Sequence, residues 1–189
     1  MGRRIGNTFT TRDYITSAPL PNYGTTSYAV ISHGEVIDMV LSLLESHKLL
    51  VDKELYRCNR EANIAQGVYH INTPDSDPDM GMMFAWVNSY DKSTRFQCCV
   101  GAVVKVNGNY AISGDMASYI RKHTGNARNE ALGQIDGQLT NASTYYHRLI
   151  QDKEKMKLVI VPEKLRAEIL GRLLFKDRLI NLEQASVIR

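Results

Sequence analysis

The stretch Met82–Val106, MMFAWVNSYDKSTRFQCCVGAVVKV, decides the fold of this chain. Two apolar runs, Met82–Val87 and Phe96–Val106, flank the polar residues Asn88–Thr94. Apolar runs of this length, rich in aromatic and β-branched residues and separated by a short polar segment, are typical of the two strands of a β-hairpin. We therefore expect an antiparallel hairpin with Asn88–Thr94 as the loop at its tip.

Further strands are predicted on both sides of this hairpin. Leu49–Cys58 and Gly67–Ile71 have strand composition upstream of it. Downstream, Asn107-Gly108 favours a tight turn because both residues tolerate positive φ, and Tyr110–Ile112 returns as a short strand. Successive strands without intervening helices favour an antiparallel meander over alternating βαβ units.

Helical periodicity precedes and follows the strands. Ser32 stands three residues before Glu35, the spacing of a capping box, and apolar residues follow at helical period. A short helix is expected at Asp115–His123 and a long one from about Asn129 to Lys155. Further helices are expected from Pro162 to Phe175 and from Asn181 onward.

These elements predict an α+β fold, in which an antiparallel meander sheet has helices packed on one face and a long helix follows the sheet. We expect three parts: an irregular N-terminal arm over 1–27, an α+β core domain over 28–157, and a C-terminal helical extension over 158–189. The last helix is still running at Arg189, which leaves room for the natural chain to extend beyond it.

Charge is unevenly distributed along the chain. The net charge of +3 and the isoelectric point near 8.7 are too mild to require a nucleic-acid partner. However, Gly34–Met80 has nine acidic residues against four Lys and Arg, whereas Arg95–Arg128 has five Lys and Arg against one acid. A positive patch is expected if this second segment lies on one face.

Cysteine usage and hydropathy indicate the compartment. Cys58, Cys98 and Cys99 have no disulfide-framework spacing, and no signal peptide or membrane-spanning run is visible. We expect a cytoplasmic protein of the host cell with no membrane partner. Cys98 and Cys99 are adjacent in a predicted strand, so their side chains should point to opposite faces and cannot chelate one metal together.

No catalytic or metal-binding motif is present. Asp75–Asp79 resembles half of a calcium loop but lacks its central glycine and terminal glutamate, so a solvated acidic loop is expected. The five histidines show no metal spacing, and no nucleophile-elbow, zinc-protease or phosphate-loop motif is found. We expect no metal, no cofactor and no catalytic residue, although an enzyme of unrecognised type stays open.

The polar tip and the basic segment are the candidate contacts to an anionic polymer. Amide, hydroxyl and guanidinium groups all donate hydrogen bonds to phosphate oxygens. The candidate nucleic-acid-binding residues are Asn88, Ser89, Tyr90, Arg95, Lys105, Arg121, Lys122 and Arg128. On the residues alone, a solvated hairpin turn in which Asn88 and Asp91 cap local backbone groups is the favoured interpretation of the tip.

The same choice applies to the other candidate features. Arg121–Arg128 combines a helix end, a glycine turn and the start of a helix, which favours an anion, but Arg121 and Lys122 also suit the negative end of their own helix. Phe84 and Trp86 share one strand face, as in a platform for stacking bases, but a core role is the plainer interpretation.

The residues Asn88-Ser89-x-Asp91-x-Ser93-Thr94, the strand Gly101–Val106 with its Asn-Gly turn, and Arg121-Lys122-His123-Thr124 together resemble the phage/plasmid-like family of mobile-element proteins. That resemblance implies a phage, prophage or plasmid origin and a DNA-related context, and it supplies no active site. The strands followed by a long helix are also similar in outline to the core of single-strand annealing recombination proteins.

We therefore expect a non-enzymatic, phage- or plasmid-encoded protein that binds nucleic acid, DNA in the first place, with single-stranded DNA binding or annealing as its role and a homo-oligomer as its form. The alternative is a phage structural or host-interaction protein that oligomerises and binds protein instead of nucleic acid. Its turn-rich N-terminal arm and apolar C-terminal helices favour this alternative.

Overall fold

The computed structural model describes residues 5, 9–22, 30–73, 77–91, 93–106, 109–113, 127–177 and 180–187. The chain divides into two compact units, 1–150 and 151–189. Six strands lie in the order β1-β2-β3-β4-β5-β6, each antiparallel to its neighbour. The strands are β1 (Phe9–Thr10), β2 (Leu50–Cys58), β3 (Ile64–Asn72), β4 (Met80–Ser89), β5 (Gln97–Val106) and β6 (Asn109–Ser113).

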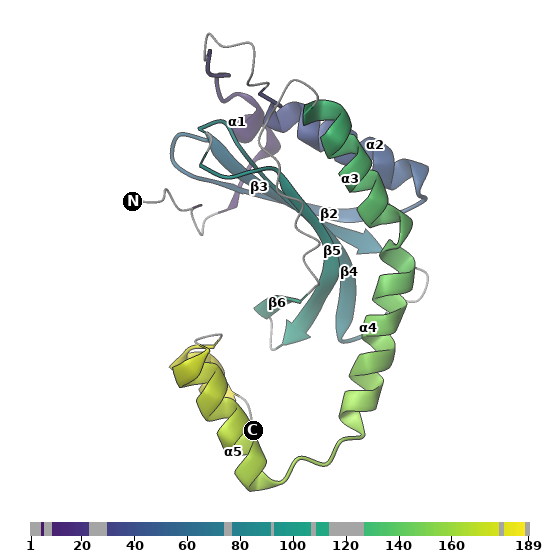
Figure 1. The fold of residues 1–189 in the computed structure, drawn as a ribbon, viewed down its shortest axis with the longest axis vertical. Coiled ribbons are helices and arrows are strands. Elements are labelled where there is room, and N and C mark those ends of the chain that lie inside the picture. The colour runs from purple at the N-terminus through teal and green to yellow at the C-terminus, as the bar shows by residue number, and fades with distance from the viewer. Residues whose placement is uncertain are drawn as a thin grey trace. The chain divides into compact units, whose positions relative to one another are not determined.

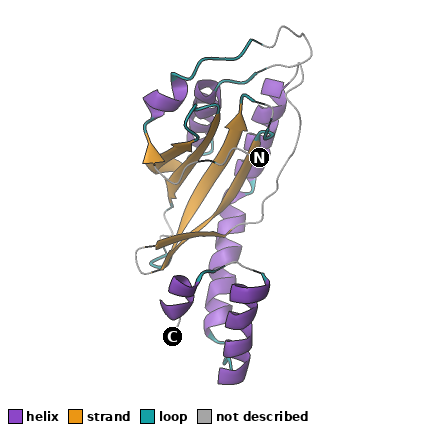
Figure 2. Cartoon of the chain, turned by 90° about the vertical axis from the view of Figure 1, so that its left-hand side faces the viewer, coloured by secondary structure: helices purple, strands orange, loops and turns teal. Residues whose placement is uncertain are grey.

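The predicted α+β meander is confirmed, with the helices α2 (His33–Ser46) and α3 (Ala127–Thr140) on one face of the sheet (Figure 1). Figure 2 shows the strands side by side in one twisted sheet. The central hairpin is also confirmed, since β4 pairs with β5 from Met80↔Val104 to Val87↔Gln97.

Helix α2 forms as its capping box predicts. The Ser32 hydroxyl accepts from the Glu35 N–H at 3.0 Å, and the Glu35 carboxylate accepts from the Ser32 N–H at 2.9 Å. The apolar stripe then points into the core, with Val36, Val40 and Leu44 fully buried. These side chains pack against residues of the sheet in the main core and so hold α2 on the sheet.

The long helix predicted from Asn129 to Lys155 is two helices in the structure, α3 and α4 (Ala142–Lys157), which meet at Asn141. The predicted apolar stripe is nevertheless the buried one, with Ile135, Leu139 and Tyr146 at most 3% exposed. The Tyr146 hydroxyl donates to the Met80 carbonyl at 2.9 Å and so ties α4 to the start of β4.

The N-terminal segment is more regular than an irregular arm, so that prediction was wrong for its described part. Strand β1 pairs with β2, and the short helix α1 (Arg12–Thr16) follows, capped by Thr11. Ile15 is fully buried in the main core. A threonine that caps the first turn was the local signal for this helix.

The two faces of the sheet differ in the size of the apolar cluster that each one carries. Alternate residues of the central strands, such as Phe84, Trp86 and Cys98, join the helices in the main core. The opposite face carries a smaller apolar cluster around Met83, Ala85 and Val103, against which Cys99 packs. Cys98 and Cys99 thus lie on opposite faces, as predicted from their adjacency in a strand.

The C-terminal unit consists of the end of α4, an apolar connector, and three short helical segments. These are α5 (Glu163–Gly171), a π-helical turn η1 (Arg172–Lys176) and α6 (Leu182–Val187). The predicted helical extension is therefore present, with Pro162 at the N-cap of α5. No helix in the described part of the chain is long and apolar enough to cross a membrane.

Candidate nucleic-acid interface

The three tip residues predicted to contact nucleic acid are buried. Asn88 and Ser89 have no exposed surface and Tyr90 is 2% exposed, so the prediction of an exposed contact at these positions was wrong. Asn88 and Ser89 still belong to β4, and the Asn88 Nδ2 group and the Ser89 hydroxyl find partners in the protein, whereas the buried Asn88 Oδ1 has none among the described residues. The sequence showed polar side chains, but not that these side chains are held inside by residues far away along the chain.

Buried His33, at the first turn of α2, organises this polar cluster. Asn88 Nδ2 donates to the Ile31 carbonyl at 2.9 Å and lies 3.1 Å from His33 Nδ1, which accepts from it. His33 Nε2–H donates to the Ala62 carbonyl at 3.0 Å. Burial lowers the pKa of His33 to about 4, against which the Ala62 hydrogen bond raises it. The imidazole is therefore neutral at neutral pH and serves as a structural connector.

Tyr90 joins the same cluster from the hairpin tip. Its ring stacks on His33 with centroids 4.0 Å apart, and its hydroxyl accepts from the His33 N–H at 2.7 Å. The Tyr90 N–H donates to the Asn63 carbonyl at 2.7 Å, which places the β2–β3 turn beside the β4–β5 tip. Burial raises the pKa of Tyr90. The tip is thus a packing element that fixes the start of α2.

We expect Tyr90→Phe to lower the free energy of unfolding by about 1–2 kcal/mol, because the buried N–H of His33 loses its acceptor. Chemical denaturation monitored by circular dichroism measures this. Tyr14→Phe is the matched control, since the Tyr14 hydroxyl donates to the Arg60 carbonyl at an exposed site and its loss should cost less than about 0.5 kcal/mol. Equal effects of the two variants would contradict the buried role of Tyr90.

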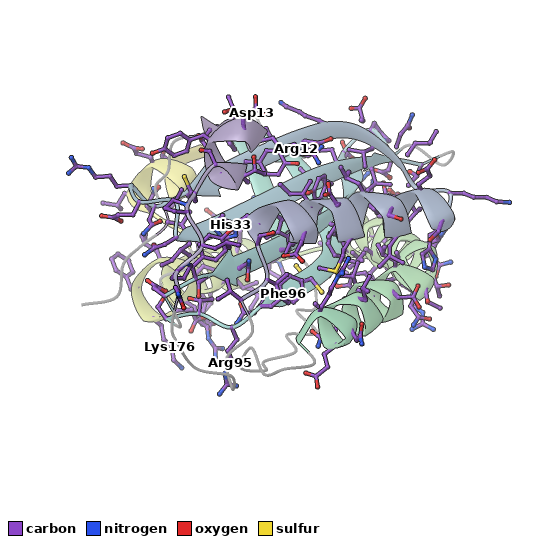
Figure 3. All side chains as sticks on the ribbon, turned by 90° about the horizontal axis from the view of Figure 1, so that it is seen from above. Arg12, Asp13, His33, Arg95, Phe96 and Lys176 are labelled. Carbon is purple, nitrogen blue, oxygen red and sulfur yellow. The ribbon has the colours of Figure 1, made fainter. Side chains whose placement is uncertain are left out.

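The predicted basic residues are only partly described. Arg95 and Arg128 are exposed, Arg95 beside the hairpin tip and Arg128 in the first turn of α3. Figure 3 shows His33 in the interior and Arg95 at the periphery. Lys105 lies on β5 opposite Tyr110, with its side chain outside the description, and Arg121 and Lys122 lie outside the described residues. The gathering of these cations into one positive patch stays a prediction.

The positive charge concentrates in the C-terminal unit, a signal that the sequence analysis missed. Residues 1–150 carry fourteen Lys and Arg and fourteen Asp and Glu, whereas residues 151–189 carry nine and six. The net charge of +3 therefore belongs entirely to the C-terminal unit. A sum over 151–189 would have identified it.

An exposed aromatic residue stands between two of these cations in the sequence. Phe175 is 75% exposed in the π-helical turn η1, between the exposed Arg172 and Lys176. Arg172 lies 3.7 Å from the Asp177 carboxylate. π-Helical turns occur frequently at functional sites, and an exposed ring flanked by cations is the arrangement on which single-stranded bases stack. Phe175 with its neighbours is therefore a second candidate interface open to solvent, besides the exposed Arg95 and Arg128.

Within the described residues, no group of three or more His, Cys, Asp and Glu side chains is arranged to hold a metal ion. Part of the predicted acidic loop Asp75–Asp79 lies outside the description, and the Asp77 carboxylate accepts from the N–H groups of Asp79 and Met80. The Asp77 side chain therefore caps backbone N–H groups of its own loop at the point where β4 begins.

No protein-family model, curated protein or solved structure matches the chain.

Proposed function

We propose that this protein binds single-stranded nucleic acid through its C-terminal unit, in the cytoplasm of a host cell that carries a phage or plasmid. The observation that carries the proposal is the exposed ring of Phe175 between Arg172 and Lys176. The net charge of +3 on residues 151–189 supports it, since a phosphate backbone is attracted to such a surface. DNA is the expected polymer because of the resemblance to mobile-element proteins.

The chemistry of this surface favours single strands over duplexes. A base can stack on an exposed ring only when it is not already stacked inside a double helix. The cations beside Phe175 neutralise phosphates without reading base edges, so we expect little sequence preference. Binding should be weaker at high salt, because neutralised phosphates release counterions.

We expect Phe175→Ala to weaken binding to a fluorescein-labelled oligothymidylate by about 5- to 150-fold, the range that follows from stacking worth about 1–3 kcal/mol per base. Fluorescence anisotropy at low and moderate salt measures the affinity and its salt dependence. Lys176→Gln should instead reduce the slope of log affinity against log salt by about 0.7.

Phe175→Leu is the matched control for stacking, since it keeps an apolar side chain and removes the ring. A loss with leucine equal to that with alanine supports stacking, and full retention with leucine argues for plain apolar contact. Leu182→Ala, also exposed in this unit, should leave the affinity unchanged. Failure of the unmodified protein to bind any oligonucleotide at low salt would remove the proposed function.

A second candidate function is assembly with protein, as expected of a structural or host-interaction protein. The observation that favours it is the exposure of large apolar side chains throughout residues 151–187, where no described residue is buried. Apolar exposure of this extent marks interaction surfaces in soluble proteins. Light scattering with and without oligonucleotide separates the two candidates, since assembly alone predicts a defined oligomer without nucleic-acid affinity.

A further inference from the structure

The connector between α4 and α5, Leu158–Val161, presents an apolar run to solvent. It begins in the turn in which the Leu158 and Val159 N–H groups donate to the Lys155 and Met156 carbonyls. Leu158 is 82% and Ile160 92% exposed, and the segment lies outside any helix or strand (Figure 1). Three of its four residues, Val159, Ile160 and Val161, are β-branched, a composition that fits a pleated strand. Such a segment pairs readily with any sheet edge that offers unpaired backbone groups.

The outer edge of β2 is such an edge. Strand β1 pairs with β2 only at Tyr56 and Arg57, so Leu50–Leu55 has no outer strand partner within the described residues. Leu50 is 69% exposed there. Two features disfavour unspecific pairing of other strands with this edge, as is usual for open edges. They are the register shift between Val51 and Lys53 and the exposed charged side chains of Asp52–Glu54.

The charges of the two segments are complementary. Residues 34–80, which include β2, carry nine acidic residues and four Lys and Arg, whereas residues 151–189 carry six and nine. Close to the connector the charges are mixed, since Lys155 and Lys157 form ion pairs with Asp152 and Glu154, so the complementarity lies in the net charge of the whole segment. Charges that repel an arbitrary strand thereby favour a strand from a unit of net positive charge, which gives the edge a preferred partner.

We propose that the connector Leu158–Val161 of one molecule adds as a short strand to the Leu50–Leu55 edge of a second copy of this chain. Every copy carries both surfaces, so two molecules can make the contact twice and close a twofold dimer. Main-chain hydrogen bonds supply affinity in this mode, and the side chains on alternate positions supply specificity. The proposal goes beyond nucleic-acid binding and does not depend on it.

The test is light scattering coupled to size exclusion over a range of micromolar concentrations, with the full chain and with Ile160→Pro. We expect a concentration-dependent dimer whose dissociation constant rises about tenfold or more in the proline variant, because proline lacks the N–H that a strand donates. Ile160→Thr is the control, since it keeps the N–H and the β-branched shape and should retain most of the affinity.

A second measurement identifies the contact itself. A tagged chain with Leu50→Cys and an untagged chain with Ile160→Cys are mixed, with unmodified protein as the blank for the native cysteines. We expect an oxidative cross-link between tagged and untagged chains that exceeds the one given by Leu182→Cys, a control at another exposed apolar position of the same unit. A monomer at all concentrations overturns the proposal. So does a dimer that Ile160→Pro leaves intact and that cross-links no better than the control, since the copies would then meet elsewhere.

Discussion

Replacing Gly67 by alanine is expected to lower the free energy of unfolding by about 3 kcal/mol, at the upper end of the range for overpacked cores. Gly67 lies on β3 directly opposite Trp86 on β4, and the indole covers it. A Cβ at Gly67 would lie 2.3 Å from Trp86 Nε1 and 2.5 Å from Cε2. No van der Waals contact tolerates these distances, so the indole or the strand must move.

The indole has little room to move. Trp86 is 1% exposed, and its Nε1–H donates to the Tyr69 hydroxyl at 3.1 Å. The His33 ring stacks near the indole, with ring centroids 6.3 Å apart. A displaced Trp86 would lose the hydrogen bond and disturb the polar cluster around His33, which is why a single methyl group should cost so much.

Urea denaturation of Gly67→Ala and Gly81→Ala measures this effect against a matched control. Gly81 also lies within a strand, but a Cβ there would meet nothing within 4 Å. Gly81→Ala should therefore be neutral or stabilising by up to about 1 kcal/mol, through lower entropy of the unfolded chain. On a Trp86→Leu background, Gly67→Ala should cost far less than in the native sequence. A Gly67→Ala protein as stable as Gly81→Ala would contradict the packing of Trp86 over Gly67.

Acid is expected to destabilise the protein through His33 by up to about 3 kcal/mol, the size of the lowered pKa converted at about 1.4 kcal/mol per unit. The unfolded chain binds a proton near pH 6.5, but the folded chain only near pH 4. The contribution of His33 to the free energy of unfolding is therefore fully present above pH 6.5. It declines as the pH falls toward 4, and below that pH the loss stays constant. The cause is burial of the imidazole, which disfavours its charged form. In addition, a protonated Nδ1–H would face the Nδ2 donor of Asn88 inside the core.

Denaturation curves across this pH range, compared with those of His33→Gln, measure the effect. Glutamine has one donor and one acceptor and does not titrate, so the variant should lose some stability at neutral pH but show a shallower decline in acid. His47→Gln is the control, because His47 is partly exposed and lies 2.8 Å from the Asp136 carboxylate on the surface. If His33→Gln has the same acid profile as the native sequence, the buried imidazole is not the group responsible.

The sheet could be predicted from the sequence because its information is local. Apolar runs of strand composition and the capping box at Ser32 specify their elements within a few residues, and neighbouring strands pair in sequence order. The predicted Asn107-Gly108 turn lies outside the described residues. The burial of Asn88 and Tyr90 could not be predicted in this way. Their partners Ile31 and His33 are more than fifty residues distant in sequence, so local polarity indicated solvent where the fold supplies hydrogen bonds instead.

The candidate site shows the same division. Arg95 is exposed as expected, because a hairpin tip with a charged residue at its end leaves that residue in water. The exposed ring of Phe175 was not predicted, since an apolar residue on a helix is ordinarily assigned to a core. The break between α3 and α4 at Asn141 was likewise not predicted, because no proline or glycine stands beside Asn141.

The order of the strands along the sheet also bears on how the chain acquires its structure during synthesis. From β2 to β6 each strand pairs with the one made just before it, so the sheet can grow by successive additions as the polypeptide leaves the ribosome. Helix α2 is made before these strands and can shield part of the growing apolar face, but α3 is made only after β6. The part of the apolar face that α3 covers must therefore stay exposed in the nascent chain while the segment from β6 to α3 is translated. During this interval the nascent chain offers a chaperone the largest apolar surface.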